Sequence, residues 1–252
     1  MKDRPEIKEI MDIALRTGKI LLTSGAEIYR VEDTIARVCD SYGVKCENFV
    51  LPTGIFVSIK MANGDSVSEI MRIRGRNVNL HKIELVNTFS RRLREEPLPY
   101  ETANKILSEI ENTPQFKMHI RILAAGVWAF VFTLLFRGTF SEGLVAAIIG
   151  MLVYLIKSKI SEIGFYEFLE FCVSGMNTAL MSLLAVKLFP QMNVYKIIIG
   201  AIVIFAPGVA ITNSINDALR GDIVSSLAGM GETVLVVTAL GLGVGIALIA
   251  GL

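Results

Sequence analysis

The chain has 252 residues, of which 52% are hydrophobic, and its formal net charge is +1 at pH 7. So apolar a composition excludes an ordinary soluble globular protein, and the near-zero charge argues against nucleic acid as a partner. Residues 1–119 carry 18 Lys and Arg and 17 Asp and Glu, whereas residues 120–252 carry 7 of each. We therefore predict an α+β domain with about three antiparallel strands over residues 1–116, followed by an all-α membrane domain of five transmembrane helices over residues 117–252.

The first 15 residues are heavily charged and contain no apolar signal segment. We therefore expect the N-terminal domain to stay in the cytosol and the protein to be a multi-pass protein of the cell (plasma or inner) membrane. Cys39, Cys46 and Cys172 form no paired motif, and the chain has two His. This pattern lacks the spacing of metal ligands, so we expect no metal site and no cofactor.

Two helices are predicted first. Apolar residues at helical spacing indicate one over Glu6–Thr23. Ser24 and Glu27 have the spacing of a capping box, with Ser24 as the N-cap of the next helix. That helix is predicted over Ala26–Tyr42, and Gly43 ends it.

A strand-rich region follows the two helices. Segments rich in Val, Ile and Phe predict strands at Glu47–Leu51, Ile55–Met61 and Ser66–Ile73. Pro52–Gly54 separates the first two strands as a turn, and Asn63-Gly64 is a strong hairpin signal between the second and third. Two more helices are predicted at Leu80–Arg94 and Tyr100–Asn112.

Four charged residues gather near the start of the second helix: Glu27, Arg30, Glu32 and Asp33. Glu27 and Arg30 lie three residues apart, so they can pair with each other or hold a substrate or a neighbouring loop. Alternatively, Glu27 serves only the capping box and the other charges form a solvated face. The spacing leaves both interpretations open.

The turn after the first strand is a second candidate in the soluble half. Thr53, between Pro52 and Gly54, can offer a hydroxyl and exposed amides, and Arg72 and Arg74 can bind a carboxylate. Ordinary turn chemistry and an exposed strand face explain the same residues. Neither alternative is excluded.

Five apolar segments in the second half are long enough, or nearly so, to cross a hydrocarbon core that needs about 20 residues. They are Ile120–Phe136, Phe140–Ile156, Phe168–Phe189, Tyr195–Asp217 and Ile223–Leu252. Arg137–Thr139 joins the first two as a tight helical hairpin.

The fourth segment is interrupted by Pro207-Gly208, where a proline removes a helical hydrogen bond and a kink or unwound turn is predicted. Polar side chains follow within about two turns, and we predict that they line a substrate or ion pathway: Thr212, Asn213, Asn216 and Asp217. A broken helix beside a carboxylate is typical of carriers of small polar solutes. A simple kink with Asp217 at the membrane edge is the alternative.

Three further polar residues are assigned to this pathway. Asp222 lies near the predicted cytosolic mouth, and Glu232 has apolar sequence on both sides. Because a charge in hydrocarbon is costly, such a residue usually faces a bundle interior or a water-filled path. Asn177, beside Gly175 in the third span, needs a partner for its amide, whereas Gly175 equally fits close helix packing.

Several motifs resemble the threonine/serine exporter family. They are LLTSGAEIYRVEDTIARVC, FVLPTGIFVSI, MRIRGRNVNLHKIELVNTFSRR and APGVAITNSINDALRGDIVSS with Glu232 following. The first contains Gly25 and the charged residues named above. The single-chain exporters are roughly twice this length with ten membrane spans, so this chain resembles their first half. It is similar to the larger subunit of the split form, which is associated with succinate or other dicarboxylates.

The resemblance implies a subunit of a secondary exporter of threonine and serine or of a dicarboxylate such as succinate. It would work in the lipid bilayer with a second five-span membrane subunit, a homo-oligomer, or both. The chain has no ATP-binding motif, so the energy is expected from an ion gradient, with protons carried by Asp217 and Glu232. A membrane-anchored ligand-sensing subunit is the alternative. A hydrolase is a third, although no nucleophile elbow or Cys–His signature is present.

Overall fold

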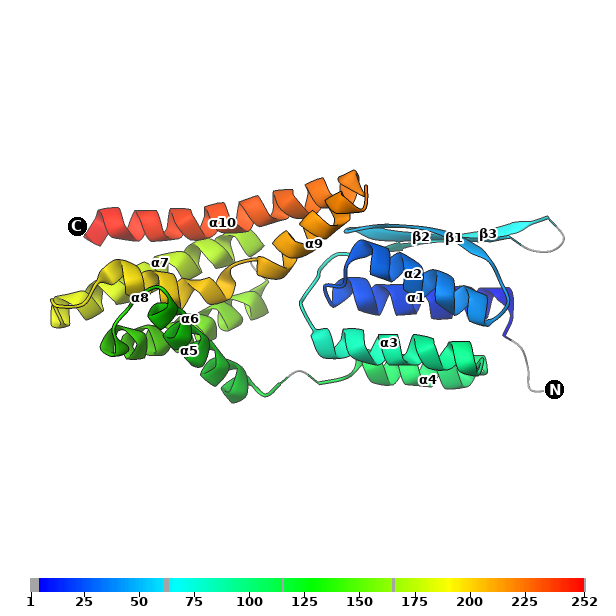
Figure 1. Ribbon diagram of the computed structural model, residues 1–252, viewed down its shortest axis with the longest axis horizontal. Helices are drawn as coiled ribbons and strands as arrows, with labels where there is room; N and C mark the ends of the chain where they lie inside the picture. Colours follow the sequence, from blue (N-terminus) through cyan, green and yellow to red (C-terminus); the bar gives the residue numbers. More distant parts are fainter. Residues whose placement is uncertain (1–4, 61–63, 115, 165, 252) are drawn as a thin grey trace. The chain divides into compact units, whose positions relative to one another are not determined.

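The computed structural model describes residues 5–60, 64–114, 116–164 and 166–251 (Figure 1). It divides into two compact units, each described by itself below. The first contains Met1–Pro114 and Val209–Met230, and the second contains Gln115–Gly208 and Gly231–Leu252. The segment after Pro207 is therefore packed with the N-terminal half of the chain.

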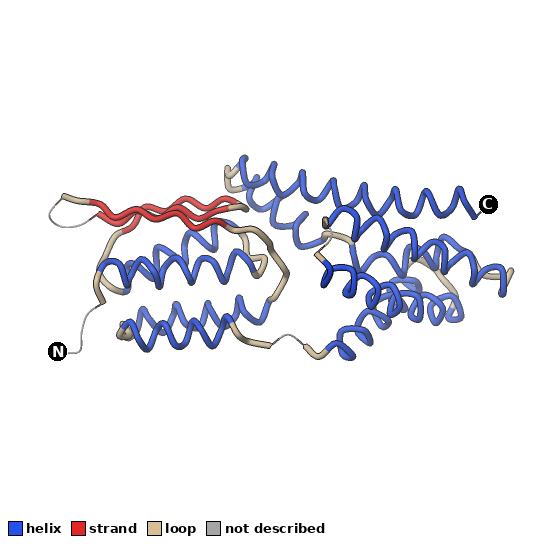
Figure 2. Tube along the Cα trace, turned by 180° about the vertical axis from the view of Figure 1, so that it is seen from behind, coloured by secondary structure: helices blue, strands red, loops and turns tan. Residues whose placement is uncertain are grey.

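The first unit is built in layers, which both views show (Figure 1, Figure 2). Its sheet is antiparallel in the order β1-β2-β3, and the helices of the N-terminal half cover one face of the sheet in two tiers. The strands are β1 Cys46–Leu51, β2 Gly54–Lys60 and β3 Ser66–Arg72. The helices are α1 Ile7–Thr23 and α2 Ile28–Ser41 next to the sheet, then α3 Leu80–Glu95 and α4 Tyr100–Glu111.

The α+β domain is confirmed, with helix bounds close to those predicted. The second predicted strand ends at Met61 and the hairpin includes Asn63, and both residues lie outside the described part of the chain. The core is continuous through both tiers, and it includes Ile59 of β2, Leu21 of α1 and Leu107 of α4. A Cβ at Gly18 of α1 would lie 2.7 Å from Ile35 Cδ1 and 3.2 Å from Ile55 Cδ1. An alanine at this position would therefore require the Ile35 side chain to shift, so Gly18 lets α1 pack closely against α2 and β2.

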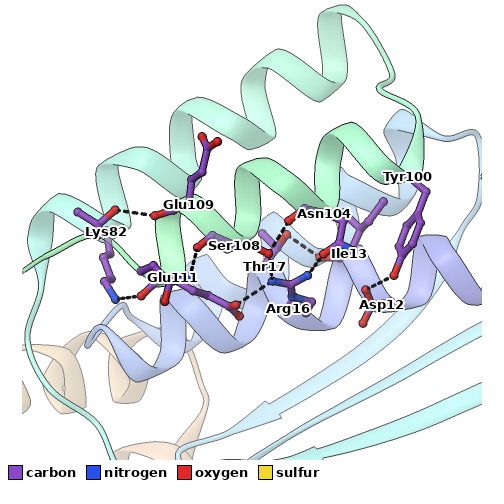
Figure 3. Close-up of polar contacts among 12 residues, drawn as sticks. Asp12, Ile13, Arg16, Thr17, Lys82, Tyr100, Asn104, Ser108, Glu109 and Glu111 are labelled. Atoms are coloured by element: carbon purple, nitrogen blue, oxygen red, sulfur yellow. Dashed lines mark hydrogen bonds and ion pairs between the residues drawn. The ribbon is translucent and has the colours of Figure 1, made fainter.

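Polar side chains join α1 to α4 (Figure 3). Arg16 Nη2 donates to Ser108 Oγ over 3.1 Å and to Glu111 Oε2 over 2.7 Å. The Tyr100 hydroxyl donates to Asp12 Oδ2 over 3.0 Å. These partly buried contacts fix α4 against α1.

The predicted capping box is wrong. Ser24 is the C-cap of α1, and Glu27 is itself the N-cap residue of α2, with extended backbone angles. Gly25 has φ +82°, and the Ala26 N–H bonds to the Leu21 carbonyl over 3.1 Å. This left-handed glycine ends α1 and needs extended residues before the next helix, so α2 begins at Ile28 and not at Ala26.

The second unit consists of apolar helices. They are α5 Met118–Leu135, α6 Phe140–Ile163, α7 Glu167–Leu188, α8 Val194–Ile202 with the 3-10 turn Val203–Phe205, and the later part of α10 Ile223–Gly251. Four helices of the described chain are long and apolar enough to cross a membrane, or five if the broken pair is one span. Of the five predicted segments, four match unbroken helices and the interrupted one matches the broken pair.

Glycines permit close helix packing in this unit. A Cβ at Gly175 of α7 would lie 2.4 Å from the Leu240 carbonyl oxygen of α10. A Cβ at Gly243 would lie 2.0 Å from the Cys172 carbonyl oxygen. The backbones of α7 and α10 therefore touch, and packing explains Gly175.

Candidate functional site

The candidate site begins where the fourth apolar segment breaks. Regular helix stops at Ile202, a 3-10 turn follows, and α9 Gly208–Leu219 begins directly after Pro207. Because proline has no N–H, the helix cannot continue its hydrogen bonds through this position. The predicted break at Pro207-Gly208 is confirmed.

Helix α9 presents one polar face to the N-terminal half of the chain, within the first unit. Asn213, Asn216 and Asp217 are three and four residues apart, which places them on one side of the helix, and Arg220 follows directly after the helix ends at Leu219. Their neighbours belong to the α1–α2 loop and the first turn of α2, within the first unit. The fold thus brings two of the sequence motifs together.

Two amides and one cation make the direct contacts. Asn213 Nδ2 donates to the Gly25 carbonyl oxygen over 3.0 Å, and Asn216 Nδ2 donates to Glu27 Oε1 over 3.0 Å. The Arg220 guanidinium lies 3.5 Å from the centre of the Tyr29 ring, in a cation–π contact. The two amide contacts lie on α9, and the Arg220 contact lies just beyond its last residue, Leu219.

Glu27 is the central group of this contact. Its Oε2 pairs with Arg30 Nη2 at 2.9 Å, while Oε1 accepts from Asn216. The Glu27 side chain is 18% exposed and the Arg30 side chain 43% exposed, so the pair lies at the rim of the site. The carboxylate is therefore shared between its own helix and α9.

Asp217 is the most enclosed acid of the site. The residue is 5% exposed, and its Oδ1 has no hydrogen-bond partner among the described residues. The backbone N–H of Ile28 interacts with the carboxyl group, and Asp222, Glu27 and Arg76 supply the nearby charges. A buried carboxylate oxygen without a partner is costly, and a ligand or a proton would satisfy it.

Glu32 and Asp222 extend the acidic region. Burial, followed by the charge of Asp222, raises the pKa of Glu32, while the Val50 N–H that Glu32 accepts opposes this shift. Asp222 Oδ1 accepts from the Ser225 N–H over 3.2 Å, at the start of α10. Asp222 therefore has a structural role as well as its charge.

Other predicted residues lie apart from α9. Asp33 pairs with Arg37 on an exposed face. Thr53 is exposed in the tight turn after β1, next to Pro52, where its carbonyl accepts from the Ile73 N–H over 3.0 Å. Gly54 pairs with Arg72 across the sheet, and the Arg72 side chain is exposed. The described hydrogen bonds of this region are those of a turn and of paired antiparallel strands.

Three residues predicted to line the pathway do not take part in the contacts described above between α9 and the N-terminal half. Asn177 Nδ2 donates to the Val173 carbonyl of its own helix over 2.8 Å, which satisfies the amide locally. Thr212 and Glu232 have exposed side chains. Glu232 is therefore not enclosed by the helices of its own unit, and it belongs to a different unit from Asp217.

Sequence reasoning missed three contributors: the Ile28 N–H, the Tyr29 ring and Arg220. Arg220 lies three residues after Asp217, and this helical spacing is the signal that could have indicated it. Nothing in the sequence paired it with Tyr29. Among the described residues, no group of three or more His, Cys, Asp or Glu side chains is arranged to hold a metal ion.

Comparison with known proteins identifies the family. Residues 12–250 match the ThrE family, described as "Putative threonine/serine exporter". The "Threonine/serine exporter" of Corynebacterium glutamicum is 24% identical over 97% of this chain and 52% of its own length. The "Probable threonine/serine exporter" of Mycobacterium tuberculosis is 21% identical over 96% of this chain and 46% of its own length. The chain thus spans about half the length of these two relatives.

A shorter relative matches over most of its length. The "Probable succinate transporter subunit YjjP" of Klebsiella aerogenes is 20% identical over 90% of this chain and 88% of its own length. No solved structure matches. Since the family match covers nearly the whole chain, the protein belongs to the threonine/serine exporter family.

Proposed function

We propose that this chain is one subunit of a secondary exporter for small polar metabolites, completed by a second five-span membrane subunit. The observation that carries the proposal is the polar face of α9, which follows a broken helix and holds the buried Asp217 beside two amides. Carriers place such groups at interrupted helices, because the freed backbone and side chains replace the hydration of a solute.

Protons are the proposed coupling ion. The chain has no ATP-binding motif, and Asp217 and Glu232 are acids within apolar segments. Asp217 has a carboxylate oxygen without a partner in the described structure, so a proton or a cationic group can bind there without displacing a hydrogen bond. The exposed side chain of Glu232 fits a water path or a second subunit covering α10.

Two substrate classes agree with the relatives. Two of them are named for threonine and serine and one for succinate, and two of these names describe chains about twice as long. The length of this chain matches the relative that is called a subunit. We therefore test amino acids and dicarboxylates together.

The test is efflux from proteoliposomes that contain this chain alone or with its five-span partner. The vesicles are preloaded with threonine, serine or succinate, and a pH gradient is imposed or collapsed. We expect efflux that requires both the partner and the gradient. Equal efflux without the partner would reject the two-subunit proposal, and efflux that ignores the gradient would reject proton coupling.

A ligand-sensing subunit is the second candidate, because the soluble half contacts α9 through its charged motif. In that case ligand binding to this chain would be measurable while no efflux occurred with any partner. The same preparations therefore distinguish the two functions.

A further inference from the structure

The polar face of α9 is occupied by groups of the soluble half. The segment Gly25–Ile28, here called the latch, offers it a carbonyl oxygen from Gly25, the side-chain carboxylate of Glu27 and the backbone N–H of Ile28. Asn213 donates to the Gly25 carbonyl oxygen, and Asn216 donates to the Glu27 carboxylate. The Ile28 N–H lies at the Asp217 carboxyl group. A charged segment of the chain thus fills a face that the proposed function assigns to the solute.

The chemistry of the latch resembles that of a zwitterion. Its carboxylate accepts from the Asn216 amide, and its N–H lies at the Asp217 carboxyl group. A solute with a carboxylate and an ammonium group on one carbon would offer the same two groups. The geometry therefore points to a competition, and we propose that the latch is an internal competitor that must leave α9 before such a solute binds.

An ammonium group would fit Asp217 better than the latch does. The latch offers this acid one backbone N–H, and Oδ1 remains buried without a partner in the described structure. An ammonium carries three donors and a positive charge, so it can satisfy both carboxylate oxygens. A dicarboxylate would instead bring two negative charges towards Asp217, Glu27 and Asp222, which disfavours it.

Release of the latch leaves no unpaired charge on the soluble side. Glu27 keeps its pairing with Arg30 at 2.9 Å when Asn216 is withdrawn. Beside the latch, the Arg220 guanidinium makes a cation–π contact with Tyr29, and the Arg220 side chain is exposed to solvent. The latch contacts α9 through two amide hydrogen bonds and the Ile28 N–H, and the Arg220–Tyr29 cation–π contact lies directly beside it, which suits a reversible connection.

The inference rests on the proposed function, and two experiments test it. The first is a reversible lock in the full chain with its partner. Tyr29→Cys and Arg220→Cys, in a background with Cys39→Ala, Cys46→Ser and Cys172→Ser, are joined by a short bifunctional thiol reagent that dithiothreitol cleaves. We expect threonine efflux to fall at least about tenfold when the link forms and to return when it is cleaved.

The cross-linked and the cleaved protein are the same variant, so any folding defect of that variant affects both measurements equally. The cysteine-substituted background, treated with the same reagent, is the control. Unchanged efflux in the linked protein would overturn the proposal, because it would show that the latch stays on α9 during transport. Absence of efflux from the unmodified chain with its partner would instead count against the proposed function.

The second experiment measures binding to the purified full chain by calorimetry. A closed latch reduces the apparent affinity by the fraction of molecules that are open. Glu27→Ala should therefore bind threonine about fivefold or more tightly than the unmodified chain, while Glu47→Ala, an exposed acid of β1, should not. Weaker threonine binding by Glu27→Ala would show that Glu27 belongs to the solute site and would overturn the proposal, as would a gain for succinate alone.

Discussion

Asn216 of α9 donates a 3.0 Å hydrogen bond to Glu27 of the α1–α2 junction, although 189 positions separate the two residues in the chain. Glu27 pairs with Arg30 through its other oxygen, so a single carboxylate connects the charged motif of the N-terminal half to the helix after the break. Asn216 differs from Asp217 in role: the amide fastens the contact, and the acid beside it keeps one oxygen without a partner in the described structure.

Removal of the Asn216 amide should loosen this connection. Asn216→Ala loses one hydrogen bond to a charged acceptor, which is worth about 1.5–3 kcal/mol. Asn216→Asp should be worse, because it places a second carboxylate against Glu27. Thermal unfolding of the detergent-solubilised chain checks the order, with Asn216→Asp least stable. Equal melting temperatures for Asn216→Asp and the unmodified chain would contradict the contact.

Asp217→Asn separates stability from coupling. The substitution removes a buried charge with an unsatisfied oxygen, so the folded chain should be as stable as the unmodified one or more stable. Because an amide cannot carry the coupling proton, efflux driven by a pH gradient should be lost. Exchange of labelled for unlabelled solute should persist at saturating concentration but with weaker apparent affinity, because the solute's ammonium group loses its counter-charge. Gradient-driven efflux at the unmodified rate would reject Asp217 as the coupling acid.

Periodicity and turn chemistry predicted the helices, the three strands and the break at Pro207, because each depends on local sequence. The capping box failed because the same letters, Ser24 to Glu27, fit both the start of one helix and the end of another. The left-handed Gly25 decides between them, and its conformation depends on tertiary context. The pairing of α9 with α2 was not predictable, since nothing local to Asn213 or Asn216 indicates Gly25 or Glu27 as its partner.

The two cysteines at the end of α2 and the start of β1 should differ in reactivity. The neighbouring Cys39 thiol lowers the pKa of Cys46, which is partly exposed. The Cys46 side chain, followed by burial, raises the pKa of Cys39. Since the thiolate is the nucleophile, iodoacetamide should label Cys46 at neutral pH and reach Cys39 only after unfolding. Peptide mass spectrometry with a time course measures both rates, and comparable labelling of the native protein at both would contradict the assignment.

Glu32 should make β1 more stable at mildly acidic pH. Because burial raises its folded-state pKa above the value in the unfolded chain, the folded state binds the proton more tightly. Stability should therefore rise as pH falls from above the folded pKa towards the unfolded value, and then level off. Glu32→Gln, which keeps an oxygen for the Val50 N–H, should remove this contribution.

Hydrogen exchange of peptides that cover β1 measures the Glu32 effect in the full chain. We expect protection, corrected for the intrinsic pH dependence of exchange, to increase between pH 7 and pH 5 in the unmodified protein and to change less in Glu32→Gln. An identical pH response in both proteins would show that another group is responsible.

Two glycines of α10, two residues apart, provide a matched test of helix packing in the membrane unit. A Cβ at Gly243 would lie 2.0 Å from the Cys172 carbonyl oxygen, whereas a Cβ at Gly245 would meet nothing within 4 Å. Both Gly→Ala changes raise helix propensity equally, so their difference isolates the contact with α7. We expect Gly243→Ala to cost about 1–3 kcal/mol, as overpacking does, and Gly245→Ala to be neutral or slightly stabilising. Thermal unfolding in detergent measures both, and equal stability of the two variants would show that α7 and α10 do not touch at Gly243.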